Sequence, residues 1–172
     1  MKVSELPYRR VTLEEVAAVA EDVLSRVKNA KSVDEILAAR EDYLKMLLEF
    51  VTNASLASMR YTINTVDPFY VAENEYYDEI GPVVSNYEVS YASALLDSPF
   101  RPELEKALSP VLFQSMEVSR KAMSNEIIED MVEENKLVRE YSDLMAAMEF
   151  AWKGEKLPRA MQIGRASCRE RV

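Results

Sequence analysis

Residues 32–65 read SVDEILAAREDYLKMLLEFVTNASLASMRYTINT, and this stretch decides the fold class. It contains neither glycine nor proline, the two residues that most strongly interrupt a helix. Ser32 and Glu35 fit a capping box at its start. Apolar residues then recur at helical spacing, at Leu37, Leu44, Leu47, Leu48 and Val51. The stretch therefore predicts one long helix that ends near Thr65.

The segments on either side of this helix are also predicted to be helical. Upstream, Thr12 and Glu15 fit a second capping box. The apolar residues that follow share one helical face, namely Leu13, Val16, Ala17, Ala20, Leu24 and Val27. Downstream, Asp67-Pro68 combines an N-cap residue with a proline at the first helical position. We expect a third helix to run from there to about Leu96, with a kink or short break at Gly81-Pro82.

The C-terminal half is predicted to hold three further helices and the start of a β-hairpin. A short helix is expected from Arg101 to Leu108, and a second from Pro110 to near Met123. Ser124 is the N-cap candidate of a last long helix. Residues 149–152 alternate weakly and precede Gly154, which favours the start of a hairpin. The whole pattern predicts an all-α fold, an antiparallel bundle of about six helices, several of them long.

Composition excludes several classes of function. The 172 residues hold 30 acidic and 21 basic side chains, a net charge of −9, which argues against nucleic-acid binding. No apolar stretch approaches the roughly 20 residues of a membrane span, and no signal peptide is recognisable, so a cytoplasmic location is expected. The single cysteine, Cys168, has no partner for an internal disulfide.

The sequence has no histidine, and this excludes most catalytic constellations. Ser-His-Asp and Cys-His sites need an imidazole, and so do the HExxH zinc motif and the Glu-x-x-His di-iron motif. The chain as it stands is therefore not expected to be an enzyme. We assign no catalytic, cofactor-binding or metal-binding residue in it.

Two residue clusters allow a functional interpretation beside a structural one. Five carboxylates share one side of a helix, at Glu126, Glu129, Asp130, Glu133 and Glu134. They could hold a hard cation, but a solvated polar face is favoured. Six of the nine tyrosines crowd the middle of the chain, at Tyr61, Tyr70, Tyr76, Tyr77, Tyr87 and Tyr91. They could line a peptide groove, but helix packing is favoured. The glycosylation sequon at Asn53 lies within a predicted helix and is discounted.

Residues 163–172, IGRASCRERV, differ abruptly in composition from the rest of the chain. They hold the only cysteine and three arginines. The segment resembles the translated adapter-derived string found at the ends of interrupted gene models. We therefore expect a non-native tail here, with a natural basic tail as the alternative.

Several stretches together resemble the N-terminal region of the oligoendopeptidase F group, within the thimet-oligopeptidase-like zinc metallopeptidases of family M3. They are residues 4–8 (SELPY), 57–65 (ASMRYTINT) with Asp67, Phe69 and Tyr70, 95–101 (LLDSPFR), 127–130 (IIED) and 134–138 (ENKLV). The resemblance covers about residues 1–156. These are scaffold segments, so the evidence for the family lies in their order and spacing.

The resemblance implies a helical lobe that forms one wall of a deep channel for short peptides. In such enzymes the other lobe holds zinc through an HExxH helix and a downstream glutamate. Residues 1–156 would then be the N-terminal lobe, 157–162 the start of the next segment, and 163–172 the non-native tail. The expected partners are the missing C-terminal catalytic domain and short peptide substrates, and the lobe alone would be inactive.

Two alternatives stay open. The chain could be a free-standing helical interaction module that docks a partner helix through its amphipathic faces. It could also be a metal binder that uses only carboxylates.

Overall fold

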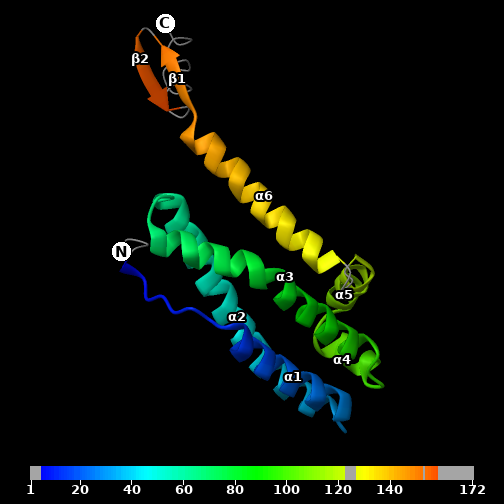
Figure 1. The fold of residues 1–172 in the computed structure, drawn as a ribbon. Helices are drawn as coiled ribbons and strands as arrows, with labels where there is room; N and C mark the ends of the chain where they lie inside the picture. Colours follow the sequence, from blue (N-terminus) through cyan, green and yellow to red (C-terminus); the bar gives the residue numbers. More distant parts are fainter. Residues whose placement is uncertain (1–4, 123–126, 153, 159–172) are drawn as a thin grey trace, which may run out of the picture. The chain divides into compact units, whose positions relative to one another are not determined.

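The computed structural model describes residues 5–122, 127–152 and 154–158. These residues form helices and one β-hairpin (Figure 1). The helices are α1 (Leu13–Asn29), α2 (Val33–Ile63), α3 (Pro68–Leu96), α4 (Arg101–Ala107), α5 (Pro110–Ala122) and α6 (Ile128–Ala147), and the strands are β1 (Glu149–Trp152) and β2 (Glu155–Pro158). The predicted all-α fold with long helices and a short C-terminal hairpin is confirmed. No described helix has the length and apolar character that crossing a membrane requires.

The N-cap residues expected from the sequence begin the first three helices. Thr12 and Glu15 form a complete capping box at the start of α1. The Ser32 hydroxyl accepts the Glu35 N–H at the start of α2. The Asp67 carboxylate accepts the N–H groups of Phe69 and Tyr70 at the start of α3. These side chains satisfy backbone donors that a helix N-terminus otherwise leaves unpaired.

Gly81-Pro82 does not break α3, which stays helical from Pro68 to Leu96. A proline within a helix removes one backbone hydrogen bond, so an interruption was expected there. Pro82 and nearby Val84 are both buried. Packing on this face of α3 compensates for the lost hydrogen bond and keeps the helix continuous.

The chain divides into two compact units, one up to Val132 and one from Glu133 onward. In the first unit, α1, α2 and α3 pack on one another, and α5 packs on α3. The largest fully buried side chains of this core come from five helices: Phe113, Ile36, Leu95, Leu104, Val16 and Val23. The core is therefore made mainly by the long helices, with α5 packed on α3 and α4 packed on α5.

The second unit holds most of α6 and the β-hairpin. The strands β1 and β2 pair antiparallel, with Ala151 opposite Lys156. Gly154 lies in the turn with φ of 85°, a conformation that favours glycine. No residue of α6 is buried, and its exposed apolar side chains include Tyr141 and Leu144.

Candidate functional site

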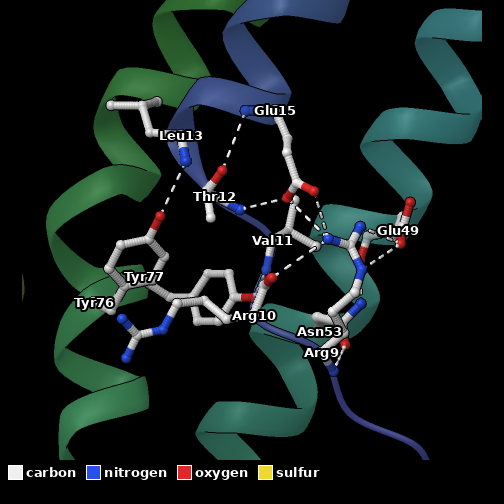
Figure 2. Close-up of polar contacts among 10 residues, drawn as sticks. All are labelled: Arg9, Arg10, Val11, Thr12, Leu13, Glu15, Glu49, Asn53, Tyr76 and Tyr77. Carbon is white, nitrogen blue, oxygen red and sulfur yellow. Dashed lines mark hydrogen bonds and ion pairs between the residues drawn. The ribbon is translucent and has the colours of Figure 1, made fainter.

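The N-terminal arm, residues 6–12, is held against α2 and α3 by hydrogen bonds to its backbone (Figure 2). The Arg9 N–H donates to Asn53 Oδ1 at 2.9 Å, and the Val11 N–H donates to the Tyr77 hydroxyl at 3.0 Å. The Leu13 N–H, at the start of α1, donates to the Tyr76 hydroxyl at 3.0 Å. Side chains of α2 and α3 thus accept hydrogen bonds from every second backbone N–H between Arg9 and Leu13.

Glu73 on α3 is the buried acidic centre of this contact and is only 5% exposed. Its carboxylate accepts hydrogen bonds from the Arg10 guanidinium and from the Tyr8 hydroxyl. Burial alone would raise the pKa of Glu73, but the hydrogen bonds from Arg10 and Tyr8 outweigh burial and hold that pKa below its ordinary value. Glu73 is therefore charged at neutral pH and fixes two arm residues.

Two further arginines add to the attachment of the arm. Arg9 forms ion pairs with Glu15 and Glu49, all of them about half exposed. Arg60 on α2 donates to the Leu6 carbonyl oxygen at 2.7 Å, and its guanidinium lies 5.0 Å from the centre of the Tyr8 ring. The exposed pairs contribute little to stability, whereas the contacts to buried groups contribute more.

A second polar feature lies in an open groove between α2, α3, α5 and the start of α6, with a volume of about 540 Å³. Tyr43 of α2 and Tyr91 of α3 stack there, with ring centres 4.0 Å apart and planes 17° from parallel. Their buried hydroxyls have no hydrogen-bond partner among the described residues. Arg40 and Glu88 line the same groove. We call this feature the tyrosine groove.

Burial shifts the pKa values of three side chains in the tyrosine groove. Burial raises the pKa of Tyr91 to about 12 and also raises the pKa of Tyr43 above its ordinary value. Burial likewise raises the pKa of Glu88. The two phenols are therefore neutral at physiological pH and available as donors.

The structure separates three of the six crowded tyrosines. Tyr76 and Tyr77 anchor the arm, whereas Tyr91 belongs to the tyrosine groove. The Tyr77 ring also packs on Phe50 of α2, with ring centres 5.5 Å apart. Asn53, the sequon residue, is buried and binds the arm. Glu73 and Arg10 belong to no recognisable motif, so sequence reasoning missed both residues.

The described residues bring together no group of three His, Cys, Asp or Glu side chains that could hold a metal ion. Of the acidic cluster on and before α6, Glu126 lies outside the described residues. The sequence has no histidine and therefore no HExxH motif to hold zinc.

Comparison with known proteins places the chain in a family. The sequence model described as the Peptidase M3 N-terminal domain matches residues 3–123. No curated protein matches the chain. Among solved structures, PZ peptidase A, determined with an inhibitor, is 34% identical and covers 91% of this chain with a TM-score of 0.87.

Two proteins assigned as oligoendopeptidase F are similar to the same degree. One is 32% identical over 98% of this chain, with a TM-score of 0.87. The other, from Bacillus anthracis, is 33% identical over 90% of this chain, with a TM-score of 0.84. The chain spans only 28% to 32% of the length of these three solved relatives. By sequence and by fold, the chain belongs to the M3 peptidase family and corresponds to its N-terminal domain.

Proposed function

We propose that this chain is the non-catalytic N-terminal lobe of a zinc-dependent oligopeptidase that hydrolyses short peptides, and that it forms one wall of the substrate channel. The observation that carries the proposal is the match of residues 3–123 to the M3 N-terminal domain. The likeness in fold to solved oligoendopeptidases supports it. In this proposal residues 1–156 form the lobe, and the parent enzyme is cytoplasmic.

The division of labour follows from the residues present. Zinc, when bound in the parent enzyme, would activate a water molecule and polarise the scissile carbonyl group. This chain offers no histidine for that metal, so the chemistry falls to the rest of the parent protein. The lobe's own residues contribute a rigid helical surface, held together by the core of α1, α2 and α3.

The remaining assignments of the chain belong to the same proposal. Residues 157–162 would begin the next segment of the parent protein, and residues 163–172 would be a non-native tail. Of these, residues 159–172 lie outside the described residues. The partners would be the C-terminal catalytic domain and short peptides.

The test compares two lengths of the gene product. The reading frame is followed beyond Gln162, and both the longer product and the 172-residue chain are assayed with zinc on a quenched fluorescent peptide. We expect an HExxH motif downstream, cleavage by the longer product, and its loss on chelation. We expect no cleavage by the 172-residue chain.

The free-standing interaction module is the competing function, and exposed apolar side chains such as Leu48 and Val66 favour it. A natural stop codon near Gln162, or a longer product without zinc-dependent cleavage, would support the module and end the peptidase proposal.

A further inference from the structure

We propose that the tyrosine groove binds a di- or tripeptide through its free amino and carboxyl termini. The inference goes beyond the proposed function, since it rests only on groups within the groove. Three observations carry it: two buried hydroxyls without partners, two opposite charges on the lining, and an apolar surface between the helices.

The hydroxyls of Tyr43 and Tyr91 are the first observation. Tyr43 is 3% exposed and Tyr91 is 5% exposed, and both side chains line the groove. A buried polar group without a partner costs about 1–3 kcal/mol. A ligand that brings acceptor oxygens to this place recovers that free energy, and a peptide carbonyl group is such an acceptor.

Opposite charges at the two ends of the tyrosine pair are the second observation. Two ring contacts show that α2 and α3 run antiparallel: Tyr43 contacts Tyr91, and Phe50 contacts Tyr77. The residue later in α2 thus meets the residue earlier in α3. Arg40 precedes Tyr43 by three residues and Glu88 precedes Tyr91 by three, so the two charges flank the pair on opposite sides. Neither forms an ion pair within the described part of the chain.

The spacing of these charges sets the length of the ligand. Arg40 and Glu88 each lie three residues from the tyrosine pair, in opposite directions along the helix axes. At a rise of about 1.5 Å per residue, their backbones are about 9 Å apart along that axis. An extended peptide spans about 3.3–3.6 Å per residue, so two to three residues cover this distance. Arg40 suits a terminal carboxylate, and Glu88 suits a terminal ammonium group.

The apolar lining is the third observation, and it selects the side chains of the peptide. Leu44 and Leu47 of α2, Val89 of α3, and Leu112 and Met116 of α5 line the groove. Its volume of about 540 Å³ falls in the range of small-molecule sites, about 300–1,000 Å³. The groove therefore fits a short peptide with apolar side chains such as Leu-Leu.

The experiment is a calorimetric titration of the 172-residue chain with Leu-Leu, N-acetyl-Leu-Leu and Leu-Leu-amide. We expect saturable binding of Leu-Leu. The N-acetyl group and the C-terminal amide should each lower the affinity about tenfold or more, because each removes one charge-assisted contact. Glu88→Gln should weaken Leu-Leu but not the N-acetyl peptide. Arg40→Gln should weaken Leu-Leu but not the amide.

The tyrosine variants separate ligand binding from a structural role. Tyr43→Phe and Tyr91→Phe should lower the affinity for all three peptides, while the Tm of the free protein stays the same or rises, because each removes an unpaired buried hydroxyl. Glu41→Gln, an exposed change on the same helix, is the matched control and should bind as the original chain does.

Three results would overturn the proposal. They are the absence of saturable heat with Leu-Leu, equal affinity for capped and free peptides, and binding that Arg40→Gln and Tyr91→Phe leave unchanged. None of these results bears on whether a longer product cleaves peptides, so the two proposals fail separately.

Discussion

Glu73 is the single residue on which the N-terminal arm most depends. It lies on α3, far along the chain from Tyr8 and Arg10, and it binds both. The tertiary contact that makes Glu73 important joins positions 63 and 65 residues apart in sequence. Local patterns do not reveal such pairs, so the sequence identified helix caps but missed this carboxylate.

Glu73 predicts an acid-dependent loss of stability. Its pKa in the folded chain lies below the ordinary value of 4.5, so its charged form stabilises the fold at neutral pH. Glu73→Gln should lower the free energy of unfolding by about 1–3 kcal/mol at pH 7. The difference from the original chain should shrink as the pH falls below 4.5 and vanish below the folded-state pKa.

Urea unfolding at a series of pH values measures this difference. Glu79→Gln, at an exposed position of the same helix, is the matched control for loss of one carboxylate. A stability difference that stays constant down to the lowest pH would show that the charge of Glu73 does not support the arm.

At the scale of single elements, the sequence was most informative where the signal is local. Thr12, Ser32 and Asp67 each cap the helix that they were expected to cap. Capping depends on a side chain and an amide two or three residues away, so a short stretch of sequence contains all that is needed. The break predicted at Pro82 does not occur, because the packing of α3 on its neighbours outweighs the tendency of proline to interrupt a helix.

The N-cap of α2 gives a prediction for one hydroxyl. Ser32→Ala removes the acceptor of the Glu35 N–H and should lower the free energy of unfolding by about 1 kcal/mol. Ser55→Ala changes an exposed serine within the same helix and should be neutral or slightly stabilising, because alanine has the higher helix propensity. Thermal unfolding of both variants tests the pair, and equal effects would argue against the cap.

The turn of the hairpin gives a prediction for one glycine. Gly154 has φ of 85°, so Gly154→Ala should destabilise the pairing of β1 with β2 by about 1 kcal/mol. Gly154→Asn should cost less, because asparagine tolerates this conformation. Backbone NMR contacts between Ala151 and Lys156 report the pairing. If the NMR contacts between the two strands are unchanged in the alanine variant, the expected backbone strain at position 154 is contradicted.

At the scale of the whole molecule, apolar side chains on the surface predict self-association. Leu44, Leu48 and Val51 share one face of α2, and all three are exposed. Unpartnered apolar faces of this kind associate in water. The chain should therefore elute earlier from size-exclusion chromatography as its concentration rises, and Leu48→Lys should reduce the shift.

Ala18→Lys, on an exposed position of α1, adds the same charge away from this face and is the control. It should leave the concentration dependence unchanged. A chain that elutes as a monomer at all concentrations would refute the prediction.

The fold class and the family were predictable from the sequence, and the polar sites largely were not. The helical spacing of apolar residues recurs along α2, so its secondary structure is predictable locally. The family resemblance rests on stretches that keep their order along the chain. The tyrosine groove depends on which residues of α2 and α3 meet, and only the packed structure places Tyr43 beside Tyr91. Sequence spacing alone grouped Tyr91 with Tyr76 and Tyr77, which lie elsewhere.

The attachment of the arm also fixes an order of events during synthesis. The arm leaves the ribosome before α3, because Tyr76 and Tyr77 follow 63 and 66 residues behind the amides that they bind. At about 5–20 residues per second, the arm waits roughly 3–13 s for them. The capping box of α1 can form in that interval, since both of its residues are already present. The arm therefore cannot reach these native contacts until α3 has been made.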